Sequence, residues 1–266
     1  MISEAKRPVQ SAAQPKLAIC QWCLPDPEIS GLTQALELGF DGVQLDLGVQ
    51  TTSRNLLDPA ILQTCLATLK QNGLAVASLG LNYLELNRSD RETEICRILD
   101  QSLEIAAKLD AGTLQLCSFW DSGMHGDQAF ANTVRHLAYI CRQAEAYGLR
   151  IGSENDLDLA GNRKLLAAVA RDNFGIYFDT ANPWLYTHVD ALELLKGVYP
   201  DICQVHIKDF KLGPKPVCVP LGQGDCRAAD ALKILQQYQY QDWLVLENNL
   251  TASQLSADLS WLRLHL

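Results

Sequence analysis

Four residues that commonly bind metal ions lie at the ends of four short apolar segments in the second half of the chain. The segments are LRIGSE, FGIYFD, ICQVH and WLVLE, and the residues that end them are Glu154, Asp179, His206 and Glu247. Because side chains alternate along a strand, the apolar neighbours of each residue point to the opposite face, so all four donors share one face. Three carboxylates and one imidazole suit Mn²⁺ best, with Mg²⁺, Co²⁺ or Zn²⁺ as alternatives.

Each of these four residues also has a structural interpretation when it is taken alone. A single acidic residue at a strand end is commonly a helix cap, and a single histidine is commonly a hydrogen-bonded structural residue. Four donors in register on successive strands are harder to explain in this way, because three converging carboxylates repel one another without a cation. The sequence therefore predicts one divalent metal ion bound by all four.

Two further residues are expected beside this site. In CQVHIKDF, residues 203–210, alternation places Lys208 on the same face as His206, so we expect Lys208 to line the pocket and contact a substrate. Trp22 lies at the end of the first predicted strand, where it could stack on a sugar ring or pack in the core. The spacing of Cys20 and Cys23 allows a redox or zinc pair, but no second pair follows, and two buried thiols in a strand are the favoured interpretation.

The elements that must position these residues recur with a regular period. Apolar segments rich in β-branched residues predict eight strands, each followed by a segment of helical period: 17–23, 42–47, 74–80, 112–119, 149–154, 174–179, 202–207 and 243–247. Several of the helical segments end in glycine, such as 59–73 and 93–112. Eight such units in about 250 residues predict a (β/α)8 TIM barrel, an α/β fold whose active site lies at the C-terminal ends of the strands. The alternative, an open doubly wound sheet, would need a glycine-rich loop after the first strand, and CQWCLPDPE has no glycine.

Composition limits the partners and the location of the protein. Residues 1–15 are polar and are predicted to form a disordered tail, and residues 16–266 a single domain. The net charge of −9 argues against nucleic acid as a partner, and no apolar run is long enough to span a membrane. The start of the chain lacks the apolar core of a secretory signal, and most of the nine cysteines lie in apolar runs, which is typical of reduced thiols in the cytoplasm. Homo-oligomerisation is left open.

Six motifs together resemble the xylose isomerase-like TIM-barrel superfamily of sugar phosphate isomerases and epimerases. They are GFDGVQLDL (39–47), SEN (153–155), FDTAN (178–182), HIKD (206–209), VPLGQGD (219–225) and LVLEN (244–248). The resemblance extends over about residues 16–250 and is nearest to the ketose 3-epimerases. It implies that Glu154, Asp179, His206 and Glu247 are metal ligands. It also implies that Glu154 and Glu247 act as acid and base on opposite faces of the substrate.

One position departs from the common form of this family. Many ketose 3-epimerases have a histidine three residues after the metal-binding aspartate, whereas this sequence has Asn182, which resembles the D-x-x-N form of the ketose-5-phosphate 3-epimerase branch. Asn182 is therefore expected to bind the substrate, whose identity is left open. Lys211, Lys215 and Arg227 could contact a substrate phosphate near the last strands, or could be solvated loop residues. No chemical role is assigned to Gln44.

These observations predict a divalent-metal-dependent isomerase or epimerase that acts on a small keto sugar or ketose phosphate. The expected reaction passes through an enediolate, with proton transfer by two glutamates. A lyase of the same fold, similar to inosose or dehydroshikimate dehydratases, is one alternative, because it begins with a similar proton abstraction. A sugar-binding or regulatory barrel without turnover is the other alternative, and an activity screen on ketoses would separate it from an enzyme.

Overall fold

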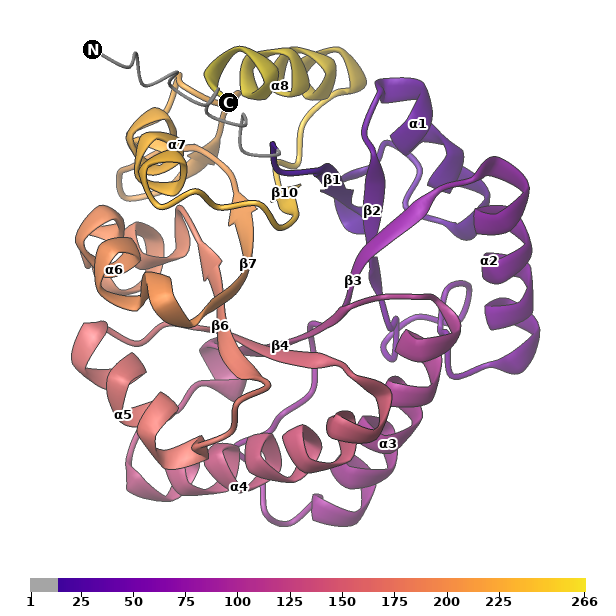
Figure 1. Cartoon of the computed structure of the whole chain (residues 1–266), viewed down its shortest axis with the longest axis vertical. Coiled ribbons are helices and arrows are strands. Elements are labelled where there is room, and N and C mark those ends of the chain that lie inside the picture. The colour runs from indigo at the N-terminus through magenta and orange to yellow at the C-terminus, as the bar shows by residue number, and fades with distance from the viewer. Residues whose placement is uncertain (1–13) are drawn as a thin grey trace, which may run out of the picture.

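The structure, a computed structural model that describes residues 14–266, is a closed barrel of eight parallel strands surrounded by helices (Figure 1). Around the ring the strands follow the order β1-β10-β7-β6-β5-β4-β3-β2, so the last barrel strand, β10, closes the ring by pairing with β1. The two remaining strands, β8 (Phe210–Lys211) and β9 (Val217–Cys218), form a small antiparallel hairpin outside the ring. The predicted TIM barrel is confirmed.

The barrel strands are short, and each is joined to the next through at least one helix. The strands are β1 (Leu17–Cys20), β2 (Gly42–Asp46), β3 (Ala75–Leu81), β4 (Thr113–Ser118), β5 (Arg150–Asn155), β6 (Phe174–Asp179), β7 (Ile202–Ile207) and β10 (Leu244–Leu246). The helices are α1 (Gln34–Leu38), α2 (Pro59–Asn72), α3 (Glu92–Lys108), α4 (Asp127–Ala144), α5 (Leu159–Val169), α6 (Ala191–Val198), α7 (Ala228–Gln237) and α8 (Ala252–His265).

Local sequence signals explain where several helices begin and end. Helix α2 begins after Asp58, whose side chain accepts a hydrogen bond from the backbone N–H of Ala60. It ends before Gly73, which adopts a left-handed φ of 63° that costs a glycine little. The end of α3 differs from the prediction, because Asp110, with φ 56°, makes the left-handed turn before Gly112 is reached.

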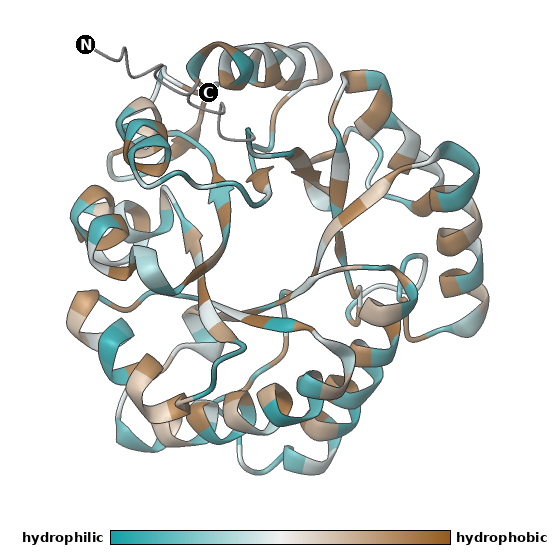
Figure 2. Cartoon of the chain, viewed as in Figure 1, coloured by the Kyte–Doolittle hydropathy of each residue, from teal (hydrophilic) through white to brown (hydrophobic). Residues whose placement is uncertain are grey.

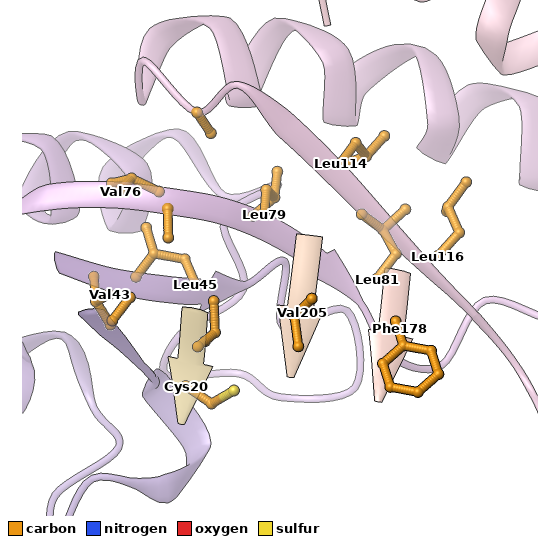
Figure 3. Packing of buried hydrophobic residues seen from close by; sticks show 14 of the residues in the cluster. Cys20, Val43, Leu45, Val76, Leu79, Leu81, Leu114, Leu116, Phe178 and Val205 are labelled. Atoms are coloured by element: carbon orange, nitrogen blue, oxygen red, sulfur yellow. The ribbon is translucent and has the colours of Figure 1, made fainter. Parts of the chain in front are cut away.

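The apolar core lies between the barrel and the helices. Side chains of β2, β3 and β4, such as Val43, Leu45 and Leu79, pack there among other buried apolar residues (Figure 3). The helices that cover them carry hydrophobic and hydrophilic residues in alternating bands (Figure 2), as expected of helices with one buried face. None of the described helices is long and apolar enough to cross a membrane.

The inside of the barrel is polar below the C-terminal mouth. Tyr177 Oη donates a hydrogen bond of 2.8 Å to Gln204 Oε1 and lies 3.4 Å from Ser78 Oγ, and all three residues are buried. Gln204 in turn donates to the backbone oxygen of Ala77. A TIM barrel usually fills this space with branched apolar side chains. Here a hydrogen-bonded floor supports the residues at the mouth.

The N-terminal region differs in part from the prediction. The strand predicted for residues 17–23 is wrong at its end, since β1 stops at Cys20 and Gln21–Cys23 form a short 3₁₀ helix. Cys20 and Cys23 are both buried free thiols. The tail predicted for residues 1–15 lies largely outside the described residues, and the extent of the single domain stays a prediction.

Candidate metal centre and active site

The four predicted metal ligands converge at the C-terminal mouth of the barrel. Glu154, Asp179, His206 and Glu247 each offer one ligand atom, and these atoms all lie within 4.8 Å of one another. His206 Nδ1 lies 3.4 Å from a Glu154 oxygen, 3.5 Å from a Glu247 oxygen and 3.8 Å from an Asp179 oxygen. This arrangement could hold a metal ion.

Strand register explains why these residues meet. Asp179, the last residue of β6, is paired with His206 on β7. On the other side of β7, Ile207 is paired with Leu246 of β10, so Glu247 follows directly at the end of that strand. Because parallel strands all end at the same rim, donors placed at strand ends come together without any long loop.

The imidazole of His206 has its two nitrogens directed to different partners. Nε2 lies 2.5 Å from Gln44 Oε1, a carbonyl oxygen that can only accept, so Nε2 donates the hydrogen bond. Nδ1 faces the carboxylates, and its lone pair is therefore placed for a metal ion. Burial lowers the pKa of His206, but Glu247 and Glu154 outweigh this effect and the pKa is raised. The carboxylates thus stabilise positive charge at this point.

The two glutamates are held by different neighbours. Glu154 accepts hydrogen bonds from Gln115 Nε2 at 2.5 Å and from Asn182 Nδ2 at 2.8 Å. Glu247 accepts from the indole Nε1 of Trp22 at 3.0 Å and from Lys208 Nζ at 2.6 Å. Each carboxylate is therefore fixed in orientation before any ligand binds.

Asp179 has one oxygen held by backbone hydrogen bonds and one oxygen that faces a cation, the ammonium of Lys208. Its Oδ1 accepts from the backbone N–H groups of Ala181 and Asn182, both at 2.7 Å. Its Oδ2 is buried and accepts no hydrogen bond from residues 14–266, but it forms an ion pair of 3.0 Å with Lys208 Nζ. Burial raises the pKa of Asp179, while the Lys208 ammonium acts in the opposite direction. A buried carboxylate oxygen without a hydrogen bond is what a metal site requires, so the donor set fits a divalent cation.

A cavity of about 240 Å³ opens over the cluster. Three of the predicted substrate-binding residues line it, namely Trp22, Asn182 and Lys208, together with Glu154 and Glu247. Its outer wall is aromatic, formed by Tyr83, Phe119, Trp120 and Tyr186. Phe119 stacks on Tyr186, and Trp120 is 61% exposed, so this wall is open to solvent at its edge.

The structure does not bring Lys211 and Arg227 to this cavity. Lys211 lies in the β8–β9 hairpin, where its exposed side chain forms an ion pair of 3.1 Å with Asp225. Arg227 precedes α7 and pairs with Asp230 at 3.0 Å. Both pairs are on the surface, and neither residue lines the cavity. Lys215 is also exposed.

Sequence reasoning missed several polar residues that contact the cluster. Gln44, to which it assigned no role, binds His206, and Gln115 binds Glu154. Arg54 and Cys117 line the cavity, and Cys117 Sγ lies 3.5 Å from a Glu154 oxygen. The sequence did carry one signal, the alternation of side chains along a strand. It places Gln44 and Gln115 at inward positions of otherwise apolar strands.

Comparison with known proteins identifies the family of this chain. The model of the xylose isomerase-like TIM barrel family matches residues 32–265, and the chain belongs to this family. The 2-epi-5-epi-valiolone 7-phosphate 2-epimerase of an Actinoplanes species is 27% identical over 256 residues, which cover 93% of each chain. The predicted family is confirmed.

Solved structures agree with the fold. A xylose isomerase domain protein from Planctomyces limnophilus has a TM-score of 0.78 and 20% identity, covering 95% of this chain and 96% of its own. A D-allulose 3-epimerase from a Methylomonas species has a TM-score of 0.76 and 16% identity, covering 96% of this chain and 99% of its own. The chain is thus a TIM barrel similar to sugar epimerases.

Proposed function

We propose that this protein is a divalent-metal-dependent epimerase or isomerase of a small keto sugar or ketose phosphate. The observation that carries the proposal is the convergence of three carboxylates and one imidazole within 4.8 Å under a cavity of about 240 Å³. Glu154, Asp179, His206 and Glu247 would hold the cation, with Mn²⁺ the preferred ion. When bound, the cation supplies electrostatic stabilisation of the negative charge that develops on the substrate oxygens.

Glu154 and Glu247 are the proposed proton-transfer groups. Inversion at a carbon next to a carbonyl needs a base on one face and an acid on the other, since a single carboxylate tends to return the proton where it came from. The two glutamates come from β5 and from the end of β10, on different sides of the cluster, and both line the cavity. Loss of a proton to one carboxylate leaves an enediolate, and the other carboxylate, protonated, completes the inversion.

Three other side chains are proposed to bind the substrate. Lys208 and Asn182 each contact one of the two glutamates and also face the cavity, so they can donate hydrogen bonds to sugar oxygens beside the reacting carbon. Trp22 offers an aromatic face next to Glu247. The names of the relatives, a 2-epi-5-epi-valiolone 7-phosphate 2-epimerase and a D-allulose 3-epimerase, support this class of substrate.

Deuterium incorporation tests the proposal. Manganese-loaded protein is screened against free and phosphorylated ketoses in D₂O, and products are followed by NMR. We expect an epimer or isomer with deuterium at the carbon next to the carbonyl. Elimination of water in place of epimerisation would identify a lyase. Absence of both turnover and exchange across the panel would argue for a binding protein and against the proposed reaction.

A further inference from the structure

Arg54 lines the same cavity as the two glutamates and the buried Asp46, whose carboxylate interacts with the Arg54 guanidinium through charge alone. Its Nε is buried and makes no hydrogen bond within residues 14–266. The nearest carboxylate is that of Glu28, at 4.0 Å from Nη1, and the Glu28 side chain is 42% exposed. An ion pair at this distance, with one partner in solvent, contributes little. A guanidinium with its donors unused in a substrate cavity is a binding group in need of an acceptor.

The other cation of the cavity is already neutralised. Lys208 Nζ lies 2.6 Å from Glu247 and 3.0 Å from Asp179, and its side chain is only 9% exposed. Within residues 14–266, no carboxylate lies at hydrogen-bonding distance from Arg54, and Asp46 acts on it only through charge. Arg54 is therefore the charged residue of this cavity that can bind an anionic group of the ligand.

The position of Arg54 is also favourable for an anion. It follows β2, and in the closed ring β2 lies on the side opposite β6, which carries Asp179. A dianionic group placed beside the three carboxylates would be repelled by all of them, whereas one placed across the cavity meets the Arg54 guanidinium and a single carboxylate, that of Asp46. A ketose could thus direct its oxygens to the cluster and its anionic end to Arg54.

The loop that carries Arg54 is compact. The backbone N–H of Leu56 donates to the oxygen of Leu47 at 2.9 Å and closes the loop at its base. Gly48 adopts φ 74°, and a Cβ at this position would meet the backbone oxygen of Arg54 at 2.3 Å. Only glycine fits there, so the loop conformation that places Arg54 depends on Gly48.

We propose that Arg54 forms a subsite for a phosphate monoester, so that the preferred substrate is a phosphorylated ketose. The inference rests on the proposed function and names its substrate class. The planar guanidinium matches two phosphate oxygens at once, which gives both charge and direction. The subsite replaces the one expected at Lys211 and Arg227, whose side chains lie outside the cavity.

Calorimetric binding to manganese-loaded full-length protein tests the subsite. The probes are D-ribulose and D-ribulose 5-phosphate, D-fructose and D-fructose 6-phosphate, and inorganic phosphate. Wild-type protein should bind at least one phosphorylated ketose about 10- to 100-fold more tightly than its free form. Arg54→Ala should remove this preference and leave the affinity for the free ketose and the metal content unchanged. Arg54→Lys should retain part of the preference for the phosphorylated ketose. Lysine keeps the positive charge but lacks the paired N–H donors of the guanidinium.

Two further variants complete the design. Gly48→Ala should weaken phosphate binding without removing the guanidinium, because it displaces the backbone at Arg54. Arg142→Ala, an exposed change on α4, is the matched control and should behave as wild type.

The outcomes separate the inference from the proposed function. A preference that survives in Arg54→Ala, or that is lost in Arg227→Ala instead, overturns the subsite and leaves the proposed function standing. Equal affinity of the wild type for free and phosphorylated ketoses also overturns the subsite and leaves the proposed function standing. Binding of inorganic phosphate that depends on Arg54, in a protein that exchanges no deuterium with any ketose, supports the subsite and counts against the proposed reaction. Failure of the wild type to bind any probe overturns both.

Discussion

The two halves of the barrel contribute different chemistry to the same mouth. The second half, from β5 to β10, contributes charge, with Glu154, Asp179, His206 and Glu247 at or just after its strand ends. The first half contributes neutral hydrogen-bonding groups to the cluster itself, while its charged residues Asp46 and Arg54 line the cavity above. Gln44 of β2 binds His206, Gln115 of β4 binds Glu154, and Trp22, just after β1, binds Glu247.

This difference shows that a ligand set can be fixed without adding charge to it. An amide or an indole orients a carboxylate or an imidazole as well as an acid or base would, yet it leaves the net charge of the cluster unchanged. The second half is therefore expected to determine whether a cation binds and whether proton transfer takes place. The first half is expected to determine the affinity for the cation and the geometry of its ligands.

The largest effect is expected from the charged half. Glu154→Gln and Glu247→Gln should each lower kcat by about 10³-fold, because an amide cannot move a proton. One of the two variants should still exchange deuterium into recovered substrate in D₂O, since the base on one face is intact. Glu104→Gln, an exposed change on α3, is the control. Full activity in either variant would rule out the two-carboxylate mechanism and leave the metal site untouched.

An intermediate effect is expected from the amide that holds the imidazole. Gln44→Ala removes the acceptor at 2.5 Å from His206 Nε2, so the ring loses its fixed orientation and metal affinity should fall about 10- to 100-fold. Competition with a chromophoric chelator measures this affinity, and saturating metal should restore most of the activity. Gln237→Ala, exposed on α7, is the control. Unchanged affinity would mean that the first half does not tune the metal.

The smallest effect is expected from the indole. Trp22→Phe keeps an aromatic face but removes the donor to Glu247, a bond worth about 1 kcal/mol, which corresponds to a factor of about five. If Glu247 is a proton-transfer group, the loss should appear in kcat with metal content unchanged. Trp261→Phe on α8 is the matched substitution away from the site. A loss confined to KM would assign Trp22 to sugar binding alone.

The charged half could be predicted from the sequence, and the neutral half could not. A carboxylate or histidine that ends an apolar strand carries two signals, its residue type and its parity, and both hold for Asp179 and Glu247. Gln44 and Gln115 also point to the inside of the barrel, but the amide side chain does not indicate what it binds. Its partner depends on the position of a strand that is distant in sequence. Arg54 lies in a loop whose course is set by tertiary packing. Lys211 was close in sequence to the site, but the hairpin directs it to Asp225.

The pairing of β10 with β1 also has a consequence for how the protein is synthesised. A nascent chain that has emerged through α7 contains three of the four proposed metal ligands and the arginine of the cavity, but its first strand still has an unpaired edge. Glu247 arrives with the strand that covers this edge, and Trp22, which orients it, was made some two hundred residues earlier. The ribosome must therefore release most of the barrel before the cluster is complete. If all four donors are needed to hold a cation, ring closure must precede its capture.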